Sequence, residues 1–111
     1  MPYIPCVYTV IETPVYSKKA EQILSEDERD AFAVYISKNP KAGVVVRGSG
    51  GVRKVRWALE GGGKSGGIRV MYFNRLGKGE IWLLTLYTKS ERSSIPPGEL
   101  RLLKEVIDYD R

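Results

Sequence analysis

The hydrophobic pattern of this 111-residue chain changes its period at Gly43. Before Gly43, apolar residues recur at helical spacing. After it, they alternate with polar residues between closely spaced glycine turns, which is typical of antiparallel strands. A stretch after Pro96-Pro97 returns to helical spacing. Because a chain of this length has room for one core, we expect residues 1–111 to form a single α+β domain, with helices on one face of an antiparallel sheet.

Caps and turns predict the boundaries of the elements. A short strand is expected at about Cys6 to Ile11, a first helix from Thr13-Pro14 to about Leu24, and a second from a capping box at Ser25 to Asn39-Pro40. The strands expected after Gly43 are Val44 to Arg47, Val52 to Leu59, Ile68 to Asn74 and Glu80 to Thr88. A C-terminal helix, with Leu100, Leu103, Val106 and Ile107 on one side, completes the expected architecture.

Positive charge is concentrated in the middle of the chain. From Lys41 to Lys89 there are ten Lys and Arg residues and two acids, a net charge of +8, whereas the rest of the chain carries −3. A basic segment between acidic ends is typical of a surface that binds a polyanion. The alternative is a solvated basic face without a function.

Strand alternation predicts where the basic groups point. Lys54 and Arg56 should share one face of their strand, opposite Val55 and Trp57. On the last strand, Trp82, Leu84 and Leu86 are expected on one face, and Thr85, Tyr87 and Lys89 on the other. We therefore expect Lys54, Arg56, Tyr87 and Lys89 to meet on one uncovered surface, joined by Arg69 or Tyr72 according to the register.

Several kinds of site are excluded by composition. The chain has no histidine and one cysteine, Cys6, which excludes an internal disulfide, the usual zinc sites and histidine-based triads. The loop Gly61–Gly66 matches G-x-G-x-x-G but joins antiparallel strands, so it does not predict a dinucleotide site. We expect no metal or cofactor. With no long apolar run and no basic leader, we also expect a soluble, cytoplasmic protein without membrane contact.

Four segments lie between a helical segment ending in KNPKAG and a leucine-rich helix. They are GGVRKVRW, GGGKSGG, IRVMYF and IWLLTLYTKSE. Together they resemble HigB-type toxins of the RelE superfamily, from bacterial type II toxin–antitoxin systems. The likeness runs from about Glu12 to Val106. It implies a RelE-like toxin fold and a ribosome-dependent endoribonuclease that cuts mRNA in the A site. It also implies a cognate antitoxin, a helix-turn-helix protein from the adjacent gene, through which the toxin reaches operator DNA.

The resemblance also implies roles for individual residues. Catalytic positions fall on Lys54, Arg56, Arg69, Tyr87 and Lys89, and weaker RNA contacts on Arg53, Lys64 and Tyr72. Such a site needs no histidine, because the ribose 2′-OH can attack the phosphorus while guanidinium groups stabilise the phosphate. Lys54 is the candidate base, and Lys89 or Tyr87 the candidate acid. A gyrase poison of the ParE branch and a non-catalytic RNA-binding module remain as alternatives.

Overall fold

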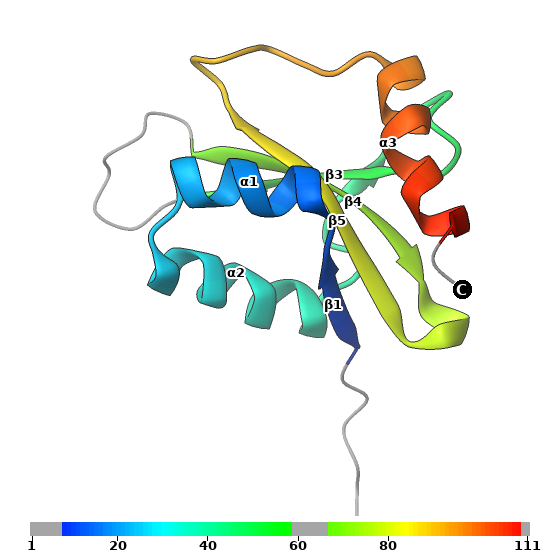
Figure 1. The fold of residues 1–111 in the computed structure, drawn as a ribbon, viewed down its shortest axis with the longest axis horizontal. Coiled ribbons are helices and arrows are strands. Elements are labelled where there is room, and N and C mark those ends of the chain that lie inside the picture. Colours follow the sequence, from blue (N-terminus) through cyan, green and yellow to red (C-terminus); the bar gives the residue numbers. More distant parts are fainter. Residues whose placement is uncertain (1–7, 59–66, 110–111) are drawn as a thin grey trace, which may run out of the picture.

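The structure is a computed structural model that describes residues 8–58 and 67–109. Within these residues, nine elements follow one another (Figure 1): β1 (Thr9–Glu12), α1 (Pro14–Ile23), α2 (Glu26–Lys38), β2 (Val44–Val45), β3 (Arg53–Trp57), β4 (Ile68–Arg75), the 3-10 turn η2 (Leu76–Lys78), β5 (Glu80–Thr88) and α3 (Pro97–Tyr109). The first part of the strand expected from Cys6, and Lys64, lie outside the described residues.

Both N-terminal helices begin at the predicted caps. Thr13 accepts a hydrogen bond from the backbone N–H of Tyr16 at 3.2 Å, with Pro14 as the first helical residue. Ser25 and Glu28 form a capping box, in which each side chain bonds the backbone of the other at 3.1 and 2.8 Å. Each cap satisfies backbone donors that a helix start leaves without partners, so these two positions fix where α1 and α2 begin.

The five strands form one mixed sheet in the order β1-β5-β4-β3-β2. The pairs from β2 to β5 are antiparallel, as the alternating pattern predicts, but β1 lies parallel to β5. The expectation of a purely antiparallel sheet is therefore wrong at this edge. No hairpin joins β1 to its neighbour, because two helices and three strands intervene, so local turn residues carry no information about its direction.

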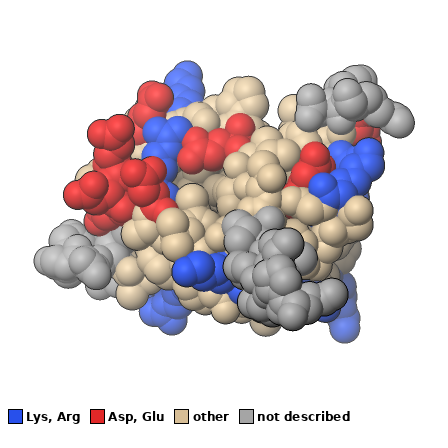
Figure 2. Space-filling model, turned by 90° about the horizontal axis from the view of Figure 1, so that it is seen from below, with Lys and Arg blue, Asp and Glu red and all other residues tan. Residues whose placement is uncertain are grey.

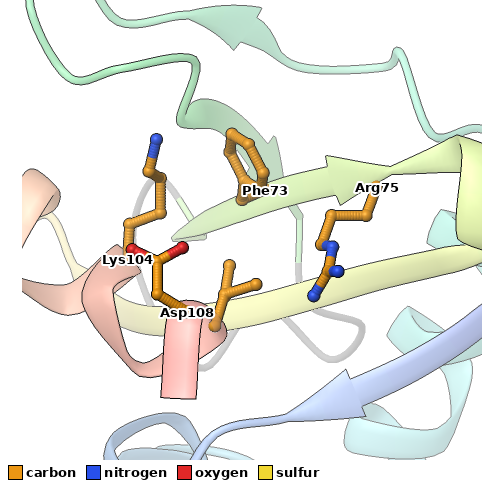
Figure 3. Close-up of a pocket in the computed structure, with 5 residues that line it drawn as sticks. Phe73, Arg75, Lys104 and Asp108 are labelled. Atoms are coloured by element: carbon orange, nitrogen blue, oxygen red, sulfur yellow. The ribbon is translucent and has the colours of Figure 1, made fainter. Parts of the chain in front are cut away.

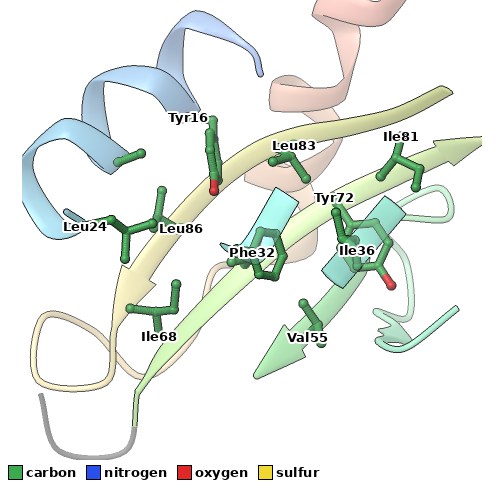
Figure 4. Close-up of a cluster of buried hydrophobic side chains, with 12 residues drawn as sticks. Tyr16, Leu24, Phe32, Ile36, Val55, Ile68, Tyr72, Ile81, Leu83 and Leu86 are labelled. Carbon is green, nitrogen blue, oxygen red and sulfur yellow. The ribbon is translucent and has the colours of Figure 1, made fainter. Parts of the chain in front are cut away.

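Helices cover both faces of the sheet. A first cluster packs α1 and α2 against one face through Tyr16, Phe32, Ile36, Val70 and Leu83 (Figure 4). On the opposite face, a second cluster includes Leu100 and Ile107 of α3 together with Met71, Trp82 and Leu84. The expectation that all helices lie on one face is wrong. All residues of β5 from Ile81 to Tyr87 are buried, so both faces of this strand need a covering layer, and helices on one face alone cannot supply it.

A β-bulge interrupts β5 next to the first helix. Met71 pairs with Thr85 and Tyr72 with Leu83, so Leu84 has no counterpart in β4. Thr13, itself buried, places its Oγ1 2.9 Å from the carbonyl of Leu83 and 3.1 Å from that of Leu84, which ties the cap of α1 to the bulge. The extra residue reverses the alternation of the strand beyond it.

This reversal changes which residues share a face. Trp82 and Leu84 belong to the α3-side cluster, whereas Leu86 belongs to the cluster under α1 and α2. The expected common face of Trp82, Leu84 and Leu86 is therefore wrong. Tyr87 lies on the α3 side.

None of the helices that the structure describes has the length and apolar character of a membrane span.

Candidate nucleic-acid interface

Three candidate side chains form one row across the sheet. Arg56 of β3 pairs with Arg69 of β4, and Arg69 pairs with Tyr87 of β5. Directly opposite residues of antiparallel strands project to the same face, with Cβ atoms about 4.5–5.5 Å apart. The register therefore selects Arg69, and not Tyr72, as the contribution of β4 to this row. Lys54 occupies the next row on the same face, opposite Met71.

The row lies on the α3 side of the sheet, toward the strand ends that lead into residues 59–66. Met71 and Tyr87 belong to the α3-side cluster, which identifies the face. The side chains of α3 that bond the backbone before β3 lie toward the other end: Arg101 donates to the carbonyl of Gly48 and Lys104 to that of Gly50. Arg56 is exposed and Lys54 and Arg69 are partly exposed, so solvent reaches the cations of this face.

Tyr87 is the buried member of the row. Its side chain is 1% exposed, packs in the same cluster as Ile95, and its hydroxyl has no hydrogen-bond partner within the described residues. Burial raises the pKa of this phenol, while the positive charges of Arg69 and Arg92 act in the opposite direction. Tyr87 therefore keeps its proton at neutral pH. The expectation that Tyr87 lies on an uncovered surface is wrong in this conformation, and its ring cannot stack on a base.

Lys89 is exposed and follows β5 directly. The turn that carries it is fixed by a hydrogen bond from the N–H of Glu91 to the carbonyl of Thr88 at 3.1 Å and by an ion pair between Glu91 and Lys19 of α1. Lys89 is two residues beyond Tyr87 and so lies at the end of the sheet that holds the arginine row. Four of the five predicted catalytic residues share this face, and Lys89 adjoins it.

Tyr72 and Arg53 lie on the opposite face. The Tyr72 side chain is fully buried, and its hydroxyl donates to the carbonyl of Pro40 at 2.8 Å and accepts from the N–H of Gly43 at 2.9 Å. Burial raises the pKa of Tyr72. Arg53 donates to the carbonyl of Gly43 at 2.7 Å. These groups hold the turn before β2, so the structure does not place Tyr72 or Arg53 on the face of the candidate catalytic residues.

Gly43 is the centre of that turn. A Cβ atom on Gly43 would lie 2.6 Å from the carbonyl oxygen of Lys54, closer than any normal contact. The backbone before β2 can therefore approach β3 only because residue 43 lacks a side chain.

Sequence reasoning did not single out Arg92, which contributes to the electrostatics of Tyr87. Its guanidinium donates to the carbonyl of Ser94 at 3.0 Å and contacts Glu99 at 3.4 Å. Arg92 lies in the connection to α3, where strand alternation gives no prediction. Ile95, in the same connection, packs in the cluster that holds Tyr87, which keeps this part of the chain near the phenol.

One group of acidic side chains lies at the start of α2, on the opposite side of the sheet. Glu26, Asp27 and Glu28 occupy the first turn of α2, where they favour the positive end of the helix dipole. Figure 2 shows acidic groups concentrated at one end of the surface seen from below. Within the described residues, no three His, Cys, Asp or Glu side chains come together as metal ligands. We interpret Glu26, Asp27 and Glu28 as charges that stabilise the start of α2.

A separate hollow of about 230 Å³ lies between β4 and α3 (Figure 3). Phe73, Arg75, Lys104, Ile107 and Asp108 line it. The Lys104 ammonium lies 4.6 Å from the centre of the Phe73 ring and also bonds the carbonyl of Gly50. This hollow is at the opposite end of β4 from Arg69, so it is not part of the arginine row.

A scan of the sequence against known protein families finds no match. Among solved structures, the chain is similar to an arginine double mutant of the E. coli toxin RelE in the free state, with a TM-score of 0.59. The match covers 88% of this chain and 97% of that chain at 16% sequence identity. This chain has the RelE-like fold. The comparison establishes the small α+β architecture of a mixed five-stranded sheet with three helices, and at this identity it establishes the fold alone.

Proposed function

We propose that the protein is a HigB-type toxin of the RelE superfamily, a ribosome-dependent endoribonuclease that inhibits translation in the cytoplasm by cutting mRNA. One observation carries the proposal: Arg56 and Arg69 stand opposite each other on an accessible face, with Lys54 in the adjoining row. Two forked guanidinium groups side by side suit a phosphodiester, whose equatorial oxygens accept paired hydrogen bonds. The RelE-like fold supports the same assignment.

The reaction that suits these residues is an in-line transfer within the RNA. The ribose 2′-oxygen forms a bond to phosphorus, and the bond from phosphorus to the 5′-oxygen of the next nucleotide breaks. Products are a 2′,3′-cyclic phosphate and a 5′-hydroxyl. Arg56 and Arg69 stabilise the charge on the equatorial oxygens, because guanidinium groups offer paired, permanently charged donors.

Two proton transfers complete the reaction. Lys54 is the candidate base that accepts the proton of the 2′-OH. Lys89 is the candidate acid for the leaving 5′-oxygen, since its side chain is exposed beside the row. Tyr87 keeps its proton but is covered, so it can serve as the acid only if the segment that carries Ile95 moves away. In the present conformation it lies beside Arg69 in the row.

The weak acid–base groups of this site explain why a ribosome would be required. A message held in the A site has its reactive geometry arranged by the ribosome, so the toxin need only supply charge and protons. We further propose a cognate antitoxin, a helix-turn-helix protein from the adjacent gene. Contact with operator DNA would occur only through that antitoxin.

Induction in bacterial cells, followed by mapping of transcript 5′ ends, tests the proposal. We expect new 5′ ends within translated regions, and their loss in Arg69→Ala. DNA breaks with intact messages would instead indicate a gyrase poison. Steeply salt-dependent RNA binding with intact messages would indicate a non-catalytic RNA-binding module. Either result would overturn the ribonuclease assignment.

A further inference from the structure

A hollow of about 460 Å³ opens at the C-terminal end of α2, on the side of the sheet away from the arginine row. Tyr35, Asn39, Pro40, Lys41 and Ala42 line it. It combines an aromatic ring, a side-chain amide and an ammonium group in one shallow depression. These are the three kinds of group that contact an unpaired nucleotide through its base plane, its base edge and its phosphate.

The walls of this hollow are held by hydrogen bonds. Asn39 donates from Nδ2 to the carbonyl of Tyr35 at 2.9 Å, and the N–H of Ala42 donates to the carbonyl of Asn39 at 3.0 Å. The carbonyl of Pro40 accepts from the Tyr72 hydroxyl at 2.8 Å and from Asn74 at 2.7 Å. The turn after α2 is therefore fixed before any ligand arrives, which reduces the entropy lost on binding.

Tyr35 is supported from behind by a second aromatic ring. Its ring centre is 4.7 Å from that of Trp57, and both rings pack against the α1/α2-side core. Both residues are only partly buried. A ring held in this way can receive a base without first losing side-chain freedom.

The charges around the hollow favour a polyanion. Between Ala31 and Leu59 the sequence has no acid, and of its six Lys and Arg residues Lys54 and Arg56 face the other side of the sheet. Arg53 lies on the side of the hollow. Lys38, in the last turn of α2, and Lys41 are both exposed. An acidic peptide would use the same cations but has no need of an aromatic plane, so single-stranded RNA fits the whole set of groups better.

The edge of the sheet offers a route between the hollow and the arginine row. β2 pairs only with Arg53 and Lys54 of β3, so within the described residues the outer edge from Val55 to Trp57 has no strand partner. Arg53 points to the side of the hollow and Lys54 to the side of the row, since alternate residues of a strand face opposite ways. Cations thus lie on both sides of this edge.

We propose that the hollow formed by Tyr35, Asn39 and Lys41 binds a nucleotide of single-stranded RNA at a second contact, remote from the scissile phosphate. The inference rests on the proposed ribonuclease function for its substrate class. The RNA passes around the β2–β3 edge, so that one segment meets the arginine row while a neighbouring nucleotide stacks on Tyr35.

Binding of a short 2′-O-methylated oligoribonucleotide, which lacks the attacking hydroxyl, tests this contact by fluorescence anisotropy at several salt concentrations. The double variant Lys38→Glu/Lys41→Glu should bind at least ten-fold more weakly than the matched control Lys18→Glu/Lys78→Glu, whose lysines are also exposed. Its salt dependence should fall by about one unit of log–log slope for each lysine that contacts phosphate. Equal weakening in both double variants would overturn the proposal.

Stacking is tested separately with the same oligonucleotide carrying 4-thiouridine for photocrosslinking. We expect crosslinks to the peptide containing Tyr35, retained in Tyr35→Phe and lost in Tyr35→Leu, with thermal unfolding used to show that both variants are folded. Crosslinks confined to β3, β4 and β5 would overturn the second contact. If messages are cleaved with dependence on Arg69 but the hollow binds no RNA, this inference alone fails. If the hollow binds RNA and no message is cleaved, the proposed function fails instead.

Discussion

Arg69 of β4 stands directly opposite Tyr87 of β5, which sets a permanent cation beside a buried phenol. The arginine is partly exposed and the phenol is covered, so RNA can contact Arg69 but not Tyr87. In the conformation described, charge stabilisation belongs to the guanidinium groups of Arg69 and Arg56. The phenol lies beside Arg69 in the row and keeps a proton that has no acceptor within the described residues.

Replacing Arg69 tests this division. Arg69→Ala should reduce message cleavage on ribosomes by about 10²- to 10³-fold, because one preorganised charged donor is lost from the transition state. Arg69→Lys should retain part of the activity, since an ammonium keeps the charge without the fork. Cleavage is measured by primer extension, and Lys78→Ala, an exposed lysine of η2, is the matched control. Full activity in Arg69→Ala would show that the row is not the site.

The chemistry of the cut ends is a second expectation. Attack by the 2′-OH leaves a 2′,3′-cyclic phosphate on one fragment and a 5′-hydroxyl on the other. The new 5′ ends should therefore accept a labelled phosphate from polynucleotide kinase without prior dephosphorylation. Fragments ending in a 3′-hydroxyl would contradict the proposed role of the ribose.

Tyr16 should make the free energy of unfolding fall at alkaline pH. Its side chain is fully buried, its hydroxyl has no partner within the described residues, and burial raises the pKa of the phenol above its usual value. The unfolded phenol ionises near pH 10 while the folded one keeps its proton, so this group costs stability as the pH rises above about 10. Tyr16→Phe should match or exceed the stability of the parent at pH 7, because it removes an unbonded buried hydroxyl. Urea unfolding at pH 7 and 11 should show a smaller alkaline loss in Tyr16→Phe than in the control Tyr35→Phe.

Glu12 should make the free energy of unfolding fall at acid pH. Hydrogen bonds from Arg29 and, more weakly, from Ser17 lower the pKa of this carboxyl. Its stabilising effect is complete above the unfolded value of about 4.3 and disappears as the pH falls through the lower folded pKa. Arg29→Met should reduce the acid-side loss of unfolding free energy and lower stability at pH 7. An unchanged pH profile between pH 2 and 5 would show that the pair contributes nothing.

Thr13 links stability to activity. Thr13→Val removes the cap of α1, a loss of about 1 kcal/mol, together with the contacts to the carbonyls of Leu83 and Leu84 at the bulge. Because the bulge determines which face Tyr87 occupies, cleavage should fall as well as stability. Ser25→Ala is the matched control, since it removes an exposed helix cap of similar value far from β5. Equal cleavage activity in both variants would show that the bulge does not affect the arginine row.

Sequence alone predicted the elements well wherever a local signal existed. Thr13 and Ser25 begin their helices by bonding the first free N–H groups, and such caps act within three residues. The strand predicted to end at Thr88 does end there. These features need no knowledge of distant contacts, so the pattern of residues was sufficient.

Features set by distant contacts were not predicted. The apolar run Ile81-Trp82-Leu83-Leu84 has no polar residue to mark a change of phase, so the bulge and the second covered face were hidden. Tyr72 looks like an amphipathic surface residue, yet the turn at Pro40 and Gly43 satisfies its hydroxyl and allows complete burial. Alternation alone correctly placed Lys54 and Arg56 on one face, whereas the choice between Arg69 and Tyr72 required the observed register of β3 and β4.

The parallel pairing of β1 with β5 has a consequence for how each copy is made. Thr9 pairs with Glu80 and Glu12 with Leu83, so this edge of the sheet can form only after β5 has been synthesised. A nascent chain must therefore extend through β5 before its first strand can pair with a neighbouring strand. Pairing of β1 follows the synthesis of β2, β3 and β4, although β1 precedes all of them along the chain.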